Sequence, residues 1–398
     1  MSGTYSEKLS APEKRVMVIA VTVTSMIAIG VSSVAPSLPL LGRHFGTDEV
    51  TTALLITSFT LPGLLFLPLA GFFADRYGRK AVLLPSLIIF GLSGTACAFT
   101  SSFETMLALR AVQGISAAPF GMLGATLIGD TFNGPKLGRM MGVNGSVLNV
   151  TLALSPAIGG FLANIHWKAI FILPLIALAA AVFSFRQPLQ KPENKPPLKG
   201  YFQSVLGLLR NRKVLALLGL GFFNLFITYG PILTCFSLLA DSKHQASPAH
   251  IGYILGSLSI SAAITAPWAG KMLSRTSPHK LLVAGQSCIA VGLAIIPFVG
   301  ILWLHLVPIL LFGAGIGLCS TTVVSTMVAQ APTEQRASLM SAYGMSLCLA
   351  QTAAPLICGA ITKWFGVDYA FFSMAVAAAI MVALSRNIRW DKQSAATA

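Results

Sequence analysis

Residues 71–80 read Gly71-Phe72-Phe73-Ala74-Asp75-Arg76-Tyr77-Gly78-Arg79-Lys80 and lie between two long apolar runs. Asp75 is the only acid of this stretch and has Arg76, Arg79 and Lys80 around it. A turn this tight between two helices needs the backbone freedom of glycine, which Gly78 supplies. Because an acid among bases can pair with them or cap a helix end, the spacing predicts a charged latch between neighbouring helix ends.

Apolar runs recur along the whole chain of 398 residues, of which 55% are hydrophobic and only 10% charged. Soluble proteins carry about 25% charged residues, so this composition excludes a cytosolic enzyme. A helix needs roughly 20 apolar residues to span a bilayer. The runs are continuous rather than alternating, which excludes a β-barrel. We therefore expect an all-α membrane protein with twelve spans, near 16–40, 50–73, 81–100, 104–129, 137–163, 167–186, 214–239, 248–273, 280–300, 304–330, 336–362 and 367–387.

The basic residues are distributed unevenly around these spans. If both termini are cytoplasmic, 22 of the 27 Lys and Arg residues lie in cytoplasmic segments, and Arg110 lies within a span. The other four lie outside: Arg43, Lys168, Lys243 and Lys363. This asymmetry is the positive-inside pattern, so the net charge of +15 indicates topology. We expect a multi-pass protein of a bacterial inner membrane, with the lipid bilayer and not a nucleic acid as its partner.

The two halves of the chain resemble each other at a constant offset. Pro68-Leu69-Ala70-Gly71 aligns with Pro267-Trp268-Ala269-Gly270, 199 residues later, and the same offset relates Gly114 to Gly313 and Pro156 to Pro355. Such a repeat is typical of transporters built from two facing halves. The predicted division is a cytoplasmic segment (1–15), a six-helix bundle (16–186), a cytoplasmic linker (187–213), a second six-helix bundle (214–387) and a cytoplasmic tail (388–398).

The latch stretch, with Gly71, Asp75, Arg76, Gly78, Arg79 and Lys80, resembles the signature loop of the major facilitator superfamily. Three further matches resemble its twelve-helix drug:proton antiporter branch: Gly30 to Pro39 in the first helix, Arg110-Ala111-Val112-Gln113-Gly114 in the fourth, and Gly142, Pro156, Gly159 and Gly160 in the fifth. Thr151 and Ser155 stand where the fifth-helix motif has glycines. The resemblance covers essentially the whole chain and implies the major facilitator fold, with two six-helix repeats around a central cavity.

Arg110 is the one basic residue expected well inside a span, away from both of its ends. A charge at a helix centre costs about 2.5–3.5 kcal/mol on insertion scales, so Arg110 should face the protein interior, with Gln113 on the same helix face. The alternative is that Arg110 snorkels to the nearby helix end. The matching arginine of the family is implicated in proton coupling, and the resemblance implies that role for Arg110. Further candidates for coupling are Asp75 and Asp130, both near cytoplasmic helix ends.

None of the twelve acids falls in the middle of a span. Relatives that export lipophilic cations often carry an acid in the first helix, where this chain has Thr24 and Ser32. The expected cavity therefore favours neutral or anionic substrates over cations. The candidate substrate contacts are Arg110, Gln113, Asn144, Asn224, Thr228 and Tyr343, although each can instead form a helix–helix hydrogen bond. The six histidines lie in loops or near interfaces, where we expect them to be solvated.

These patterns predict a secondary transporter that works by alternating access and is not an enzyme. We expect proton-coupled efflux of small amphipathic compounds, including drugs, by a monomer whose partners are the small-molecule substrate, protons and lipid, without cofactor or metal. One alternative is efflux or uptake of a specific metabolite, such as a sugar or a siderophore-like molecule. A membrane-embedded enzyme or a channel is disfavoured, because the spans lack clustered His, Asp and Glu and the chain has both the repeat and the latch.

Overall fold

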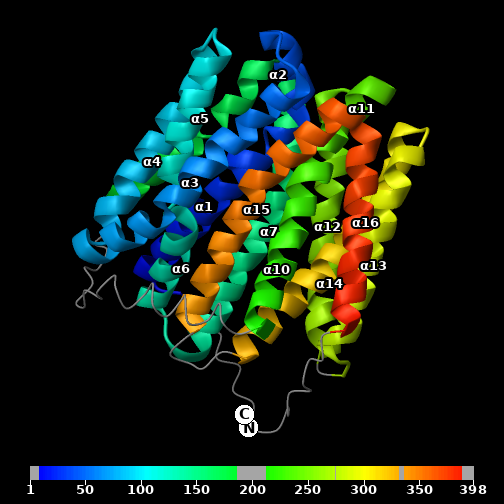
Figure 1. Cartoon of the computed structure of the whole chain (residues 1–398). Helices are drawn as coiled ribbons and strands as arrows, with labels where there is room; N and C mark the ends of the chain where they lie inside the picture. The colour runs from blue at the N-terminus through cyan, green and yellow to red at the C-terminus, as the bar shows by residue number, and fades with distance from the viewer. Residues whose placement is uncertain (1–8, 186–211, 274, 331–335, 388–398) are drawn as a thin grey trace.

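The computed structural model describes residues 9–185, 212–273, 275–330 and 336–387, which are almost entirely helical (Figure 1). The first half contains α1 (Ala11–Ser32), α2 (Leu38–Phe45), α3 (Glu49–Tyr77), α4 (Arg79–Ala96), α5 (Phe103–Ala117), α6 (Phe120–Thr131), α7 (Gly134–Ile165) and α8 (Leu175–Phe185). The second half contains α10 (Arg212–Ile227), the π-helical segment η4 (Thr228–Cys235), α11 (Phe236–His244), α12 (Pro248–Leu273), α13 (Pro278–Ile295), α14 (Leu306–Gln330), α15 (Arg336–Phe365) and α16 (Val367–Asn387). Short 3₁₀ segments join them: η1 (Ala35–Ser37), η2 (Cys97–Phe99), η3 (Trp167–Ile172), η5 (Ile296–Phe298) and η6 (Leu302–His305).

Twelve stretches of the described chain are long and apolar enough to cross a membrane, as the sequence predicted. Several spans combine two helices because a proline interrupts them. Pro119 separates α5 from α6, and Pro231 lies within η4. Proline has no backbone N–H and clashes with the preceding turn, so the helix shifts its hydrogen-bonding pattern at these positions.

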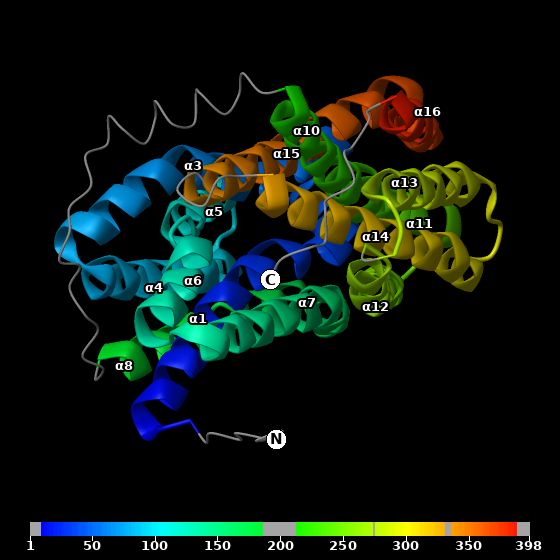
Figure 2. The same ribbon diagram turned by 90° about the horizontal axis from the view of Figure 1, so that it is seen from below.

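The 199-residue repeat is visible in the helix bounds. The helices α3 and α12 begin at Glu49 and Pro248, and the helices α4 and α13 begin at Arg79 and Pro278, so each pair is separated by 199 residues. The two halves meet along two equivalent seams, with α7 packed against α12 and α3 packed against α15 (Figure 2). The predicted linker, 187–213, lies almost wholly outside the described residues, so the exact division into bundles stays a prediction.

Candidate functional site

Arg110 of α5 is buried inside the first bundle, with 1% of its surface exposed. Its Nη2 donates to the carbonyl oxygen of Gly30 at 2.6 Å and its Nη1 to Oε1 of Gln113 at 2.8 Å. Its Nε donates to the carbonyl oxygen of Leu55 at 3.3 Å, and the guanidinium carbon lies 4.7 Å from the ring centre of Phe59. Arg110 therefore does not snorkel to a helix end, and it ties α5 to α1 and α3.

Dipoles, rather than an acid, balance the charge of Arg110. Gly30 lies in the last turn of α1, where carbonyl groups lack helical partners and the helix dipole is negative. The face of Phe59 adds a cation–π contact. No Asp or Glu among the described side chains is buried. Since an arginine keeps its proton in proteins, the first bundle contains one permanent, buried positive charge.

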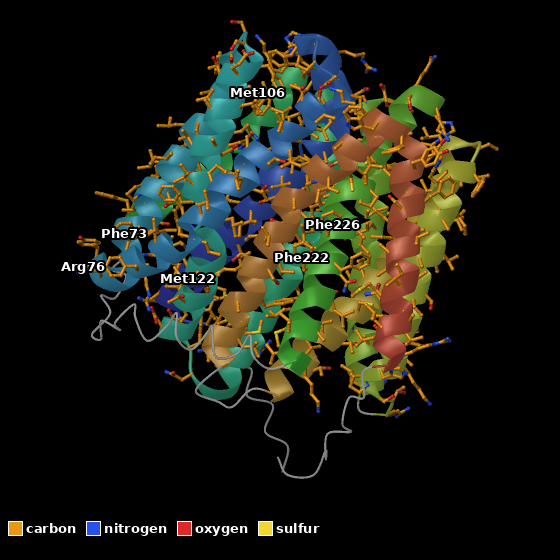
Figure 3. All side chains as sticks on the ribbon, viewed as in Figure 1. Phe73, Arg76, Met106, Met122, Phe222 and Phe226 are labelled. Atoms are coloured by element: carbon orange, nitrogen blue, oxygen red, sulfur yellow. The ribbon has the colours of Figure 1, made fainter. Side chains whose placement is uncertain are left out.

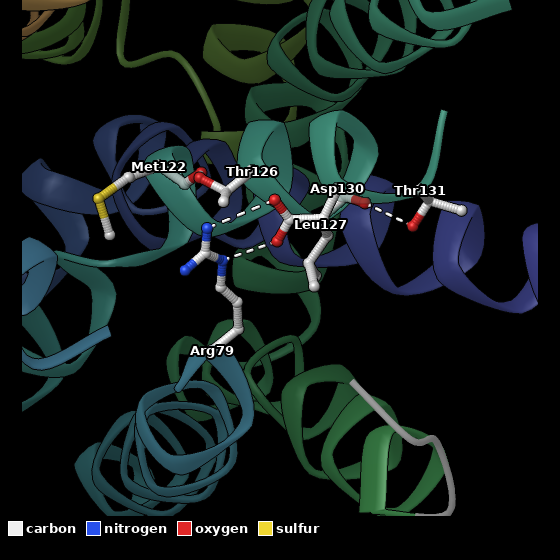
Figure 4. Close-up of polar contacts among 6 residues, drawn as sticks. All are labelled: Arg79, Met122, Thr126, Leu127, Asp130 and Thr131. Atoms are coloured by element: carbon white, nitrogen blue, oxygen red, sulfur yellow. Dashed lines mark hydrogen bonds and ion pairs between the residues drawn. The ribbon is translucent and has the colours of Figure 1, made fainter. Parts of the chain in front are cut away.

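The latch joins three helix ends at the predicted cytoplasmic face. Arg79, the first residue of α4, donates from Nε to Oδ2 of Asp130 at 2.8 Å and from Nη2 to Oδ1 at 3.4 Å, which binds α4 to the end of α6 (Figure 4). Lys80 donates from Nζ to the carbonyl oxygen of Phe185 at 2.6 Å, at the end of α8. Gly78 has a φ of 96°, a conformation that favours glycine.

The other latch residues lie on α3. Arg76 is exposed at the left edge of the molecule in Figure 3, with its guanidinium carbon 5.8 Å from the ring centre of Phe72. A Cβ on Gly71 would lie 3.4 Å from the sulfur of Met122 on α6. The backbone of Asp75 belongs to the last turn of α3, but its side chain lies outside the described residues. Among the described side chains, Asp130 is the acid that pairs with a latch base, and the role of Asp75 stays a prediction.

Asn224 and Thr228 lie one turn apart in the second bundle. The Oδ1 of Asn224 accepts a hydrogen bond from Nε2 of Gln286 on α13 at 2.8 Å, and Thr228 Oγ1 donates to the backbone carbonyl of Asn224 at 2.8 Å. Both amide side chains are buried, and Asn224 Nδ2 and Gln286 Oε1 have no hydrogen-bond partner among the described residues. Asn224 and Gln286 together thus have one unpaired donor and one unpaired acceptor, which could bind a polar group of a substrate.

The remaining candidate contacts are buried at separate places. Asn144 of α7 is 9% exposed and its Oδ1 has no partner among the described residues. Tyr343 of α15 packs against α10, where a Cβ on Gly221 would overlap its ring. Gln113 is fully buried beside Arg110. The structure thus joins Arg110 to Gln113 and Asn224 to Thr228, but no hydrogen bond of the described chain links these pairs to each other.

The seam between α7 and α12 is closed at its predicted external end. A Cβ on Gly160 of α7 would overlap the carbonyl oxygen of Pro248 on α12, and a Cβ on Gly252 would overlap that of Pro156. Gly159 approaches the carbonyl of Ser33 just as closely. Three residues of the fifth-helix motif therefore permit direct backbone contact of α7 with α12 and with the end of α1.

Nearer the predicted cytoplasmic end, glycines of α7 and α15 have no close neighbour. A Cβ on Gly142 or Gly145 of α7, or on Gly344 of α15, would meet no atom within 4 Å. Gly142 precedes Pro156 by 14 residues, which is about 21 Å along a helix. Gly142, the first residue of the fifth-helix motif, thus faces open space while the rest of the motif is pressed against its neighbours. In the predicted orientation, this is an inward-facing arrangement.

Two ion pairs join the halves at the closed end. Arg43 Nη1 lies 2.6 Å from Oδ2 of Asp241, and Lys363 Nζ lies 2.8 Å from Oδ2 of Asp48. Asp48 also caps α3 by accepting from the backbone N–H of Thr51. The ammonium of Lys363 and this cap lower the pKa of the Asp48 carboxyl well below its usual range. The carboxylate is thus charged whenever the surrounding medium is near neutral.

Sequence reasoning missed several residues that contribute to these sites. Gln286 was identifiable as a polar residue near the middle of a span, but nothing in the sequence pairs it with Asn224. Phe59 was indistinguishable from the 23 other phenylalanines of the chain. The expectation that the histidines are solvated is wrong for His305, which is fully buried, because η6 and α14 place it behind Phe236 of α11.

Comparisons with known proteins agree with this architecture. A family model described as Major Facilitator Superfamily matches residues 20–351 and 231–397. The bacillibactin exporter of Bacillus subtilis (strain 168) is 25% identical over 359 residues, which cover 85% of this chain and 88% of that protein. The class B tetracycline resistance protein of Escherichia coli is 24% identical over 330 residues, covering 81% and 82%. The crystal structure of a D-xylose–proton symporter has the same fold, with a TM-score of 0.79 over 96% of this chain and 99% of that chain at 14% identity.

Proposed function

The chain belongs to the major facilitator superfamily, and on that premise we propose that it exports small amphipathic compounds from the cytoplasm in exchange for protons. It is a multi-pass membrane transporter, not an enzyme. The proposed substrates are neutral or anionic, drugs included, and the proposed membrane is a bacterial inner membrane with both termini in the cytoplasm. The class B tetracycline resistance protein, similar over 81% of this chain, supports a drug as cargo.

The observation that carries the substrate class is the buried positive charge of Arg110, which is balanced by dipoles and not by an acid. The guanidinium is buried among carbonyl and amide oxygens, and the described part of the chain has no buried acid. A cation in the interior would find a positive charge and no counter-charge, whereas a neutral or anionic compound meets no such penalty. The unpaired Nδ2 donor of Asn224 and the unpaired Oε1 acceptor of Gln286 suit a neutral polar substituent. Arg110, Gln113, Asn144, Asn224, Thr228 and Tyr343 remain the proposed contacts.

The seam supports alternating access as the transport mechanism. Its external end is held by glycine–backbone contacts and two ion pairs, while glycines nearer the cytoplasmic end face open space. Contacts of this size can be broken and remade as the halves rock. For proton coupling, the proposed residues are Arg110, Asp75 and Asp130, of which Asp130 is bound to Arg79 in this conformation.

Purified protein in proteoliposomes provides the test. We expect proton movement when chloramphenicol, an uncharged drug, is added, and little when the cation ethidium is added at the same concentration. Proton movement should be reduced in Asp75→Asn and in Arg110→Ala, compared after each variant has been shown to fold by size-exclusion chromatography. Equal transport of ethidium and chloramphenicol would contradict the proposed substrate class, and unchanged coupling in both variants would contradict the proposed roles.

A second candidate is the export of one specific metabolite. It is favoured by the similarity to the bacillibactin exporter, which extends over 85% of this chain. Competition separates the two functions. Bacillibactin should inhibit chloramphenicol transport if both use one site, whereas a dedicated metabolite exporter would move bacillibactin and leave chloramphenicol untransported.

A further inference from the structure

Two histidines meet at the predicted external end of the second bundle. His244 is the last residue of α11, and His305 ends η6 at the start of α14. Their ring centroids are 5.1 Å apart, with the planes at 75°. His305 is fully buried, and His244 is half-buried. The pair thus extends from the outer surface into the bundle.

The Nε2 atom of each histidine is buried without a hydrogen-bond partner among the described residues. His305 Nδ1 lies 3.1 Å from the carbonyl oxygen of Leu302. A carbonyl only accepts, so Nδ1 carries the hydrogen and the neutral ring has its lone pair on Nε2. The Nε2 atoms of both His305 and His244 are buried and make no hydrogen bond within the described chain. Buried polar atoms are nearly always satisfied in folded proteins, so two orphan nitrogens in adjacent rings require an explanation.

Other histidines of the chain differ in this respect. His44 and His166 pack on Trp167, His250 packs on Trp303, and His279 Nδ1 contacts the carbonyl oxygen of Ser385. None of these four has a buried, unsatisfied ring nitrogen among the described residues. The unpaired nitrogens are therefore a property of the His244–His305 pair, not of histidines in this membrane environment generally.

We propose that His244 and His305 form a proton-accepting site for external protons, and that binding a proton there loosens the external end of the seam. This inference deepens the proposed exchange of substrate for protons and rests on it. The lone pair on Nε2 of His305 takes up one proton. The proton comes from the external water by way of His244, whose side chain is partly exposed. Imidazole is the side chain that ordinarily changes charge between pH 5 and 8.

The charges around the pair show how the proton can act on the seam. His244 follows Asp241 by three residues, so both side chains lie on one face of α11, and Asp241 is the residue that holds Arg43 of the other half. A protonated His244 competes with Arg43 for that carboxylate. The C-terminal end of α11 also favours a cation on its last residue.

The other described charged groups near the two histidines are already paired, so none of them neutralises the charge of an added proton. Lys243 of α11 is bound to Asp368 of α16 at 2.7 Å and to the carbonyl oxygen of Pro297 in η5 at 3.1 Å. His305 faces the ring of Phe236, with centroids 5.3 Å apart. On α2, Arg43 is held by Asp241, and His44 is turned to Trp167. The proton therefore adds a net positive charge next to the Arg43–Asp241 pair.

Spin labels at the external loops test the proposal. Ser101→Cys and Gly300→Cys lie in equivalent loops of the two halves, 199 residues apart, and a Cβ on Gly300 meets no atom within 4 Å. In a chain whose native cysteines are replaced by alanine, the distance between the labels is measured by pulsed electron paramagnetic resonance from pH 8 to pH 5. We expect the population with separated labels to rise at least threefold as the pH falls from 8 to 5.

Three variants make the test decisive. His244→Gln and His305→Gln should each abolish the rise, whereas His250→Gln, which alters an exposed histidine at the same face, should leave it unchanged. Because His244 is half-buried, its variant is informative even if His305→Gln does not fold. An unchanged rise in His244→Gln overturns the proposal, as does a wild-type protein without any rise. Drug-driven proton movement measured on the same samples shows separately whether the proposed exchange itself holds.

Discussion

Arg43 and Asp241 lie 198 residues apart and hold the two halves together by two hydrogen bonds, at 2.7 Å and 2.6 Å from Nη1 to the two carboxylate oxygens. Given the 199-residue repeat, they occupy nearly equivalent corners at the predicted external ends of α2 and α11. An ion pair between equivalent corners must break when the halves rock apart. It therefore stabilises one conformation of the transporter against the other, while contributing little to the fold of either half.

Neutralising this pair should shift the conformational equilibrium modestly. The Arg43 side chain is 59% exposed, and exposed pairs contribute about 0.2–1 kcal/mol. Asp241→Asn should therefore raise the outward-facing population by at most about fivefold. Labels at positions 101 and 300 measure this shift at pH 8. The charge-exchanged double variant Arg43→Asp with Asp241→Arg should restore the wild-type distribution, and failure to do so would show that the side-chain shapes, not the charges, hold the corner.

Packing of α7 against α12 should depend on Gly160 much more than on Gly145. A Cβ at Gly160 would overlap the carbonyl oxygen of Pro248, while one at Gly145 meets open space. Overpacking costs about 1–3 kcal/mol, so Gly160→Ala should hinder external closure and lower the transport rate at least fivefold. Gly145→Ala is the same change on the same helix and should leave the rate near that of the wild type. Equal rates in the two variants would contradict a closed external seam.

Much of the fold could be predicted because lipid restricts the choices. Every backbone polar group in a bilayer must be satisfied within the protein, so long apolar runs become helices, and the offset from Gly114 to Gly313 reports the repeat. The pairing of Arg110 with Gln113 was also predictable, since residues three apart share a helix face. Spacing within one helix is information that a single sequence contains.

Contacts between helices were not predictable in the same way. The carbonyl oxygens of Gly30 and Leu55, which bind Arg110, leave no mark in the sequence because every residue has a carbonyl group. Arg79 binds Asp130, which lies 51 residues away in the sequence. Only the packing of α4 against α6 brings the two side chains together. For His305, the sequence led to a wrong expectation. Its position near a span end suggested exposure to solvent, yet its ring packs against Phe236 of α11 and is fully buried.

Two substitutions of Gln113 test whether its hydrogen bond to the charged Arg110 stabilises the protein. Gln113→Leu removes the oxygen that accepts from Arg110 Nη1 at 2.8 Å, and a hydrogen bond to a charged group contributes about 1.5–3 kcal/mol. We expect a clear fall in the thermal denaturation temperature in detergent. Gln113→Glu keeps the acceptor and adds a negative charge beside Arg110. It loses no hydrogen bond, because Nε2 of Gln113 has no partner in the described chain. It should be at least as stable as the wild type. A glutamate as damaging as leucine would contradict a positive charge at Arg110.

The pair between Asp48 and Lys363 should be insensitive to pH in the range where the histidine pair responds. Lys363 and the cap at Thr51 lower the pKa of Asp48 in the folded protein below its value in the unfolded chain. A carboxyl whose folded pKa is lowered stabilises the fold above its unfolded pKa, which is near 3.9. That contribution disappears only as the pH falls through the still lower folded value. Between pH 8 and 5 the carboxylate therefore stays charged and its bond to Lys363 stays intact.

Lys363→Gln is the variant that checks this reasoning. It should raise the outward-facing population at every pH by a similar, small factor, because both partners are about half exposed. The midpoint of the pH response measured with labels at positions 101 and 300 should not move. A midpoint displaced by more than about half a pH unit would mean that Asp48 titrates in this range. The pH response would then belong to the acids of the seam, and not to His244 and His305.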